Sequence, residues 1–179
     1  MKIANTQRLS FALMTRDDAD FMYKLNLNPE VMRYINGGVP STKDDIKNVQ
    51  IPRMESYVNE EKGWGLWIVS RIDNAEQIGF VLVRPMQFFT DSPEYKNIEL
   101  GWRFTQESWG NGYATEAAEN IKQALIKKGN IEKFTAIAME DNLASIQIMK
   151  KLGLKYVKTD IHKDPLGDEE VVFYELSVK

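Results

Sequence analysis

"IELGWRFTQESWGNGYATEAAENIKQALIKKG", residues 98–129, is the stretch that decides the fold of this chain. It begins with the alternation typical of a half-buried strand. One face of this strand is expected to carry Ile98, Leu100, Trp102 and Phe104. The other face is expected to carry Glu99, Gly101 and Arg103. A loop with two glycines then leads directly into a long helix. With a buried-type strand following at 133–139, this order predicts a right-handed parallel crossover.

The helix after the loop has an amphipathic pattern. Apolar residues recur at three- and four-residue spacing, at Ala114, Ala117, Ala118, Ile121 and Leu125. The polar face is predicted to carry Glu116, Glu119, Lys122, Gln123 and Lys127. The first turn of a helix exposes unpaired N–H groups and the positive end of the macrodipole. Because Gly110 and Gly112 lack side chains that would block a ligand, several N–H groups can converge there on an oxyanion, which predicts a phosphate site.

The loop alone leaves several interpretations open. A Walker loop does not fit, because no Gly-Lys-Ser or Gly-Lys-Thr follows the glycines. The dinucleotide-binding fingerprint nearly fits residues 110–115, but Thr115 stands where a Gly or Ala is required, and the regular run of alternating strands and helices is missing. A tight turn that needs positive φ at glycine accounts for the same residues without any ligand.

Composition narrows the class of protein. The 179 residues fit one domain with a sizeable core. The hydrophobic fraction of 43% and the charged fraction of 27% are typical of a soluble globular protein. The net charge of -3 gives no reason to expect nucleic acid or an anionic membrane as a partner. The absence of cysteine excludes a disulfide scaffold, a thiolate zinc site and a cysteine nucleophile. With no apolar run typical of a signal peptide or membrane span, and no cluster of metal ligands, we expect a cytoplasmic protein without a metal.

Periodicity and turn signals divide the rest of the chain into strands and helices. Strands are predicted at 8–14, 64–72, 77–85, 97–104, 133–139, 154–161 and 170–178. Further helices are predicted at 16–26, 28–35, 43–63 and 142–153. Pro52 is expected to kink or split the third of these helices, and residues 86–95 are expected to form an irregular connection. The predicted fold class is α/β (α+β): a single domain over 1–179 with a mixed, mostly antiparallel sheet of about seven strands flanked by helices.

Two segments carry a family resemblance: "WGNGYATEA" at 109–117 and "EDNLASIQIMKKLGLKY" at 140–156. They resemble the GNAT superfamily of N-acetyltransferases, and most closely its RimJ/RimL-like branch. The resemblance extends over most of the chain and implies one N-acetyltransferase domain with acetyl-CoA as co-substrate and no metal. The implied reaction is direct attack, in a ternary complex, by a primary amine of a protein N-terminus or of a small molecule. We expect a monomer or homodimer.

In this family the loop binds the pyrophosphate of acetyl-CoA through backbone N–H groups. The matching positions are Trp109, Gly110, Asn111, Gly112, Tyr113, Ala114 and Thr115. Residues Trp102, Arg103 and Phe104 resemble the segment whose backbone pairs with the pantetheine arm and polarises the acetyl carbonyl. For the side chains of Trp102 and Phe104 we expect simple core packing. Asp141 or Asn142 is expected to cap the helix that follows, and the resemblance implies that Asn142 also contacts the cofactor.

The same resemblance, together with the chemistry, points to two catalytic residues. An alkyl ammonium has a pKa of about 10 and no lone pair, so a base is useful. Glu99 on the central strand is the candidate base, and the alternative is a half-exposed structural carboxylate. Many family members carry a tyrosine acid seven positions after the asparagine, where this chain has Met149. Ser145 is the candidate proton donor, and the alternative is an ordinary polar residue at a helix start.

Two other functions stay open. A CoA-binding sensor or interaction domain would keep the fold without turnover, and a dinucleotide-binding enzyme would use the loop for NAD(H). For the transferase, the acceptor is expected to pass between region 28–42 and the 85–95 loop, opposite the cofactor, with Phe88 and Phe89 lining the cleft. The identity of the amine stays open, because pocket-lining loops determine it.

Overall fold

One seven-stranded sheet, in the order β1-β2-β3-β4-β5-β7-β6, forms the centre of the computed structural model, which describes residues 1–178. The strands are β1 (Leu9–Leu13), β2 (Gly65–Arg71), β3 (Gln77–Met86), β4 (Glu94–Phe104), β5 (Lys133–Ala138), β6 (Lys155–His162) and β7 (Glu169–Ser177). Neighbouring strands pair antiparallel except β4 and β5, which are parallel. The predicted mixed sheet, with one parallel crossover through a helix, is confirmed.

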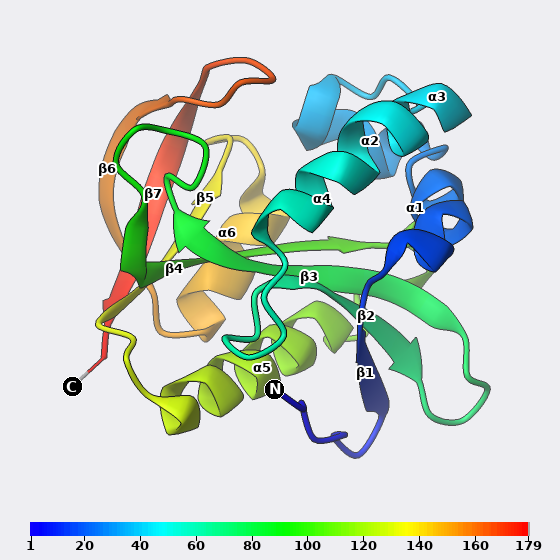
Figure 1. Ribbon diagram of the computed structural model, residues 1–179, viewed down its shortest axis with the longest axis horizontal. Coiled ribbons are helices and arrows are strands. Elements are labelled where there is room, and N and C mark those ends of the chain that lie inside the picture. Colours follow the sequence, from blue (N-terminus) through cyan, green and yellow to red (C-terminus); the bar gives the residue numbers. More distant parts are fainter. Residues whose placement is uncertain (179) are drawn as a thin grey trace.

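Helices cover both faces of this sheet (Figure 1). They are η1 (Arg16–Asp18), α1 (Ala19–Leu25), α2 (Pro29–Asn36), α3 (Lys43–Asp45), η2 (Ile46–Gln50), α4 (Ile51–Tyr57), η3 (Gln106–Ser108), α5 (Tyr113–Lys128) and α6 (Leu143–Lys151). The helices belong to two large clusters of buried side chains. In one cluster α1, α2, η2 and α4 pack on one face of the sheet, and in the other α5 and α6 pack on the opposite face. Within residues 1–178, no helix has both the length and the apolar character needed to cross a bilayer.

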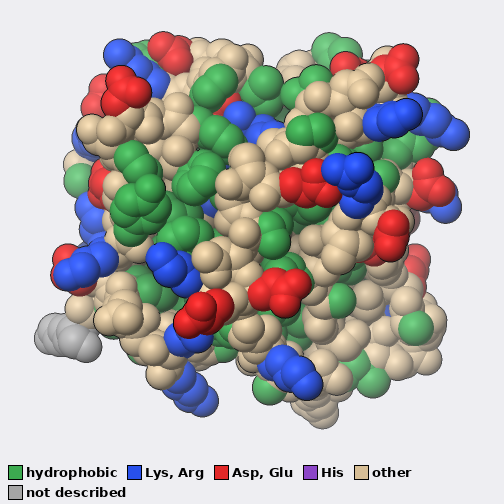
Figure 2. Space-filling view, in the orientation of Figure 1, with side chains coloured by type: hydrophobic (Ala, Val, Ile, Leu, Met, Phe, Trp, Pro, Cys, Tyr) green, Lys and Arg blue, Asp and Glu red, His purple; other side chains and the backbone are tan. Residues whose placement is uncertain are grey.

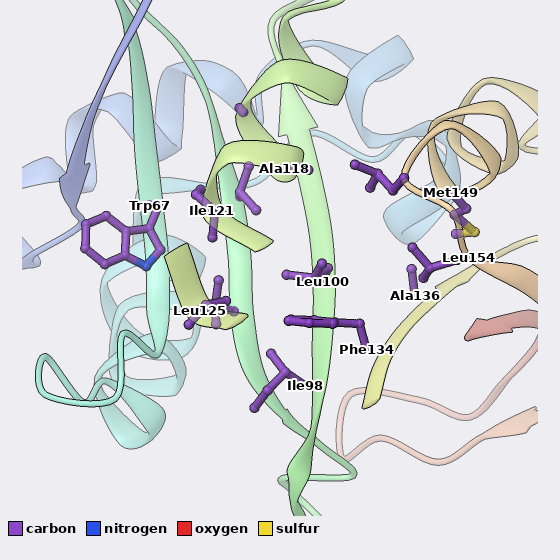
Figure 3. Packing of buried hydrophobic residues seen from close by; sticks show 14 of the residues in the cluster. Trp67, Ile98, Leu100, Ala118, Ile121, Leu125, Phe134, Ala136, Met149 and Leu154 are labelled. Atoms are coloured by element: carbon purple, nitrogen blue, oxygen red, sulfur yellow. The ribbon is translucent and has the colours of Figure 1, made fainter. Parts of the chain in front are cut away.

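The larger cluster joins α5 and α6 to the centre of the sheet. Figure 3 shows Leu100 of β4 and Phe134 of β5 directed toward the side of α5 that carries Ile121 and Leu125. All four side chains are buried. Ala117 and Ala118 are also fully buried, and their small side chains let α5 pack close to the sheet. The face assigned to the apolar residues of β4 from the alternation is therefore correct.

The pairing between β4 and β5 is short. It runs only from Asn97 opposite Lys133 to Glu99 opposite Thr135, although β4 continues to Phe104. On its other edge β4 stays paired with β3 as far as Phe104 opposite Gly79. From Leu100 to Phe104 the β5-side edge of β4 therefore has no strand partner, and the sheet opens at this point.

Three sequence expectations need correction. Lys122 is not on the polar face of α5: it is buried, and its amine donates to the Leu152 carbonyl at 2.6 Å while pairing with Glu119. The connection between β3 and β4 is shorter than residues 86–95, because Met86 ends β3 and Glu94 begins β4. The helix expected over 43–63 ends at Tyr57, and an isolated β-bridge between Asn59 and Trp64 closes a turn after it.

Pro52 does not split its helix. A π-helical turn, η2, lies before it, and the N–H of Ile51 donates to the carbonyl of Ile46 five residues back. The wider turn accommodates a residue that has no N–H of its own and whose ring would clash with the carbonyl four residues earlier. The chain therefore stays helical from α3 through α4.

Candidate active site

A cavity of about 480 Å³ lies where the sheet opens. The end of β4, the glycine loop, α2 and α6 supply its walls. Eleven of the thirteen predicted site residues line it: Trp102, Arg103, Phe104, Trp109, Gly110, Gly112, Tyr113, Ala114, Thr115, Asn142 and Ser145. The two predicted residues that do not line it are Glu99 and Asn111.

The start of α5 is open. Gly110 and Gly112 have φ values of 77° and 76°, and Gly112 is the N-cap of α5 without any side-chain capping bond. The backbone N–H groups of residues 110–115 donate to no acceptor among residues 1–178. By contrast, Asn28 caps α2 by accepting from Glu30, and Asn142 caps α6 by accepting from Ser145. The long helix beside the cavity thus keeps its N-terminal donors and its positive end free for an anion.

The loop holds its own carbonyls away from those donors. The Asn111 side chain donates to the carbonyls of Ser108 and Trp109 at 3.1 and 3.0 Å, and the indole of Trp109 donates to the Phe104 carbonyl at 3.0 Å. The backbone N–H of Trp109 already donates to Gln106, so of the predicted anion-binding amides this one is occupied. Asn111 therefore acts on the shape of the loop rather than by lining the cavity.

Arg8 is a residue of this region that the sequence patterns did not indicate. Its guanidinium donates to the Asn111 carbonyl at 3.1 Å, pairs with Glu116 of α5, and lies 4.6 Å from the centre of the Tyr113 ring. Thr6 donates to the same Glu116 carboxylate at 2.5 Å. The segment before β1 thus fixes the first turn of α5 from outside the cavity. The contacts join residues more than 100 positions apart, and no local pattern marks such a pair.

The end of β4 contributes backbone groups, rather than the side chains of Trp102 and Phe104, to the cavity. The Phe104 side chain is buried in the core, and Trp102 packs partly against the same cluster, as expected for both. Because their side chains are turned into the core and the β5-side edge of the strand has no strand partner, the backbone groups at this edge, apart from the Phe104 carbonyl that accepts from Trp109, are open to an extended, amide-bearing molecule.

The first turn of α6 lies across the cavity. Asn142 accepts a hydrogen bond from the N–H of Ser145 at 3.2 Å, which confirms Asn142 and not Asp141 as the cap. Ser145 is half-buried, and its hydroxyl makes no hydrogen bond to residues 1–178. Met149, one turn further, is fully buried in the core. Lys151 also lines the cavity and supplies a positive charge near its rim.

Glu99 occupies a different environment from the one expected. It is buried, not half-exposed, and both its oxygens accept from Arg84 of β3, at 2.7 and 3.2 Å. Burial acts to lower the pKa of Arg84, but the charge of Glu99 and its hydrogen bonds outweigh burial and raise that pKa above its ordinary value. The pair is therefore a buried, doubly bonded ion pair next to the parallel register of β4 and β5.

Of the two segments expected to flank the path of the acceptor, only α2 lies at the cavity, and the path itself stays a prediction. Residues 30, 31 and 33–35 of α2 line the cavity, but Phe88 and Phe89 do not. Their rings pack edge-on against Tyr57 of α4, at 5.8 and 6.1 Å between centres. Burial raises the pKa of Tyr57 to about 12, so its phenol is neutral at physiological pH. Arg53 of α4, stacked on Phe89, pairs with Asp164 of the β6–β7 connection and closes this side.

A model of the family described as "Acetyltransferase (GNAT) domain" matches residues 8–155, and the chain therefore belongs to this family. FsC-acetyl coenzyme A-N(2)-transacetylase of Aspergillus fumigatus is 28% identical over 180 residues, covering 93% of this chain and 72% of the relative. The Bacillus subtilis protein YkkB is 31% identical over 161 residues, covering 86% of each. A solved structure of RimL, a ribosomal L7/L12 alpha-N-protein acetyltransferase in complex with coenzyme A, shares the fold with a TM-score of 0.78 and 11% identity over 99% of this chain and 98% of that one.

Family and fold together define an enzyme. The chain is an N-acetyltransferase of the GNAT family, and acetyl-CoA is the acetyl donor that this family uses. The seven-stranded sheet with its single parallel pair is the fold it shares with the RimL structure.

Proposed function

We propose that this enzyme binds the diphosphate of acetyl-CoA on the amides of residues 110–115 and lays the pantetheine arm along the free edge of β4. The observation that carries the proposal is the set of six consecutive backbone N–H groups without an acceptor among residues 1–178, five of them in residues that line the cavity. A Cβ built at Gly110 would meet no atom within 4 Å, so the space over the loop is open. Lys151 and the helix macrodipole add positive potential for the phosphates.

We also assign the chain to the neighbourhood of the RimJ/RimL-like branch. Trp109 opens the loop, Met149 replaces the tyrosine acid of other family members, and Ser145 follows Asn142 by three residues. The acceptor in this proposal is a primary amine that reaches the thioester from the side of α2. The RimL neighbour is named for a protein N-terminus and the Aspergillus relative for an N(2) position, so the names support an amine without fixing its kind.

The proposed reaction is one direct transfer. The amine lone pair forms a C–N bond at the thioester carbonyl carbon, the C–S bond breaks, and coenzyme A leaves as a thiolate. A backbone N–H at the end of β4 stabilises the oxyanion that forms in between. Holding both substrates in one cavity supplies a large part of the rate through proximity.

The nitrogen of the ammonium loses two protons in this reaction, and the thiolate takes up one. We propose that Glu99 receives the first, before the attack, through water, because both its oxygens are held by Arg84 and the carboxylate does not line the cavity. The nitrogen loses the second as the C–N bond forms, and the free hydroxyl of Ser145 in the cavity wall is the proposed donor to the departing thiolate, regaining its own proton from the one that the nitrogen releases. A thiol pKa of about 8.5 makes this transfer to the thiolate helpful rather than obligatory.

The proposal is tested by incubating the enzyme and acetyl-CoA with a panel of N-terminal peptides, amino acids, polyamines and aminoglycosides. Released thiol is followed by absorbance and products by mass spectrometry. We expect an acetylated primary amine and stoichiometric free coenzyme A. Tight binding of coenzyme A with no product from any amine would instead indicate a CoA-binding domain without turnover.

A further inference from the structure

Arg103 is an arginine without a carboxylate partner. The chain has seven arginines. Six of them form ion pairs: Arg8, Arg16, Arg33, Arg53, Arg71 and Arg84. The seventh, Arg103, pairs with no acidic side chain among residues 1–178. It is also the arginine that β4 presents at the wall of the cavity.

Neutral groups hold the Arg103 side chain. Nη1 donates to Oδ1 of the fully buried Asn26 at 2.7 Å, and the guanidinium lies 5.3 Å from the centre of the Phe80 ring. Asn26 is itself oriented, because its Nδ2 donates at 3.0 Å to Gln50 in the π-helical turn and at 3.4 Å to Ser41. Three segments of the chain thus hold one guanidinium in place through its Nη1 edge.

The remaining edge of the guanidinium is unused. Nε is the one buried side-chain nitrogen or oxygen within residues 1–178 that has no hydrogen-bond partner, and Nη2 makes no hydrogen bond to these residues either. Nε–H and Nη2–H form the fork with which arginine grips a carboxylate through two parallel hydrogen bonds. The side chain as a whole is only partly buried, but its Nε is shielded from solvent and has no partner, so this N–H remains unsatisfied in the absence of a ligand.

The charge persists at neutral pH. Burial lowers the pKa of Arg103 to about 10, with only the Tyr57 phenol acting in the opposite direction. The side chain is therefore a cation under ordinary conditions, held at the wall of a cavity in a place where its charge is poorly solvated.

The anion that would pair with Arg103 is not the diphosphate of acetyl-CoA. Alternation along β4 places Arg103 on the face of the strand shared with Glu99, whereas Trp102 and Phe104 contact the cluster around α5. The open amides of the loop belong to the α5 side, and Asn26 and Phe80 belong to the α1–α4 side. The second substrate is the one proposed to arrive from that side.

We propose that Arg103 binds a carboxylate on the acceptor, so that the substrate class is small amines that also carry a carboxylate, such as amino acids. This inference rests on the proposed acetyl transfer to an amine. The cation of Arg103 and the cavity wall hold the acceptor by its carboxylate, so that the amine of the acceptor is directed toward the thioester of acetyl-CoA.

The test compares matched acceptors that differ only in the carboxylate: amino acids and their carboxamides, each with acetyl-CoA. For the wild type we expect kcat/KM for the acid to exceed that for the amide by about 30-fold or more, the scale of a charge-assisted bidentate contact. In Arg103→Gln the ratio should fall to near one. The comparison between variants cancels the difference in amine pKa between acid and amide. Arg16→Gln, an exposed arginine paired with Glu55, is the control and should keep the wild-type ratio.

Two results would overturn the assignment. One is an Arg103→Gln enzyme whose acid-to-amide ratio equals that of the wild type. The other is a variant in which only the KM for acetyl-CoA rises, since that would place Arg103 on the cofactor.

A second measurement decides the matter even if no amine is acetylated. Because Arg103→Met also removes the hydrogen bond to the buried Asn26, each protein is compared with and without ligand rather than with the other protein. Millimolar amino acids in the presence of coenzyme A should raise the midpoint of the wild type and leave Arg103→Met unchanged. Equal stabilisation of both proteins by amino acids would overturn the assignment. Failure of the acetyl transfer itself would appear separately, as coenzyme A binding without product.

Discussion

Glu99 has two roles in this account: it forms a buried ion pair with Arg84, and it is the proposed base. Their side chains are only 6% and 9% exposed, so each charge depends on the other for compensation. Removing one partner of such a pair costs about 3–5 kcal/mol, whereas replacing both with apolar residues of similar volume is often neutral. Single and double replacements of the pair therefore affect stability differently, and comparing them distinguishes the structural role of Glu99 from its proposed role as base.

We predict that Glu99→Gln lowers the free energy of unfolding by about 3–5 kcal/mol, because the charge of Arg84 is left buried and alone. Denaturant unfolding measures this loss. If Glu99 is also the base, the variant should lose rate most at moderate pH and recover part of it at high pH, where the amine is already neutral.

The matched control replaces both partners, as Arg84→Met with Glu99→Leu. This protein should regain most of the stability but not the rate. A double variant with the kcat and pH–rate profile of the wild type would show that Glu99 is not the base.

Single residues were predictable from the sequence only where a local pattern marks them. Gly110, Gly112 and Asn142 follow from loop and cap chemistry, which is local. The roles of Arg8 and of the Asn26 contact to Arg103 could not be predicted, because each joins positions about 77 to 108 residues apart. The burial of Glu99 was also missed, since its arginine partner lies on the neighbouring strand.

At the scale of elements, the first turn of α5 is shaped by the segment before β1. Arg8 holds the Asn111 carbonyl and Glu116 at once, which keeps the loop carbonyl turned toward the arginine. The amides of residues 110–115 are thereby left unpaired. The loop is thus organised before any ligand binds.

We predict that Arg8→Ala weakens coenzyme A binding about tenfold, because one loop-ordering hydrogen bond of about 1–1.5 kcal/mol is lost while the amides themselves remain. Isothermal calorimetry measures the change, and circular dichroism should show an unaltered fold. Arg16→Ala, which removes an exposed arginine from another ion pair, should bind like the wild type. Equal binding by Arg8→Ala and the wild type would show that the loop needs no support from this arginine.

The types and order of the elements were predicted well because each depends on short-range signals. Strict alternation indicated β4, and helical spacing with a glycine at each end indicated α5. The misplaced features are tertiary. Lys122 is buried because the end of α6 offers its amine a carbonyl acceptor, and the π-helical turn absorbs Pro52. Neither cause is visible in the spacing of residues along one helix.

At the scale of the whole molecule, the shortness of one strand pairing produces the site. Three residue pairs join β4 to β5. Beyond these pairs the sheet opens into a cavity bounded by α2 on one side and α6 on the other. On the face that Figure 2 shows, acidic and basic side chains are interspersed, with apolar groups on the left over the β3–β4 connection. With a net charge of only -3, selectivity for a substrate is expected to come from the cavity and not from a long-range field.

The central claim is that the amides at the start of α5 bind a diphosphate, and it is tested most directly by titrating coenzyme A into Gly112→Val and Gly129→Val in a calorimeter. Both glycines have positive φ, 76° and 85°, at opposite ends of the same helix, so both variants carry backbone strain. At Gly112 the strain distorts the amides of the loop, and hydrogen bonds to a charged group are worth about 1.5–3 kcal/mol each.

We predict that Gly112→Val binds coenzyme A at least about tenfold more weakly than the wild type, while Gly129→Val binds it with unchanged affinity. Equal affinity of Gly112→Val and the wild type for coenzyme A would contradict the account.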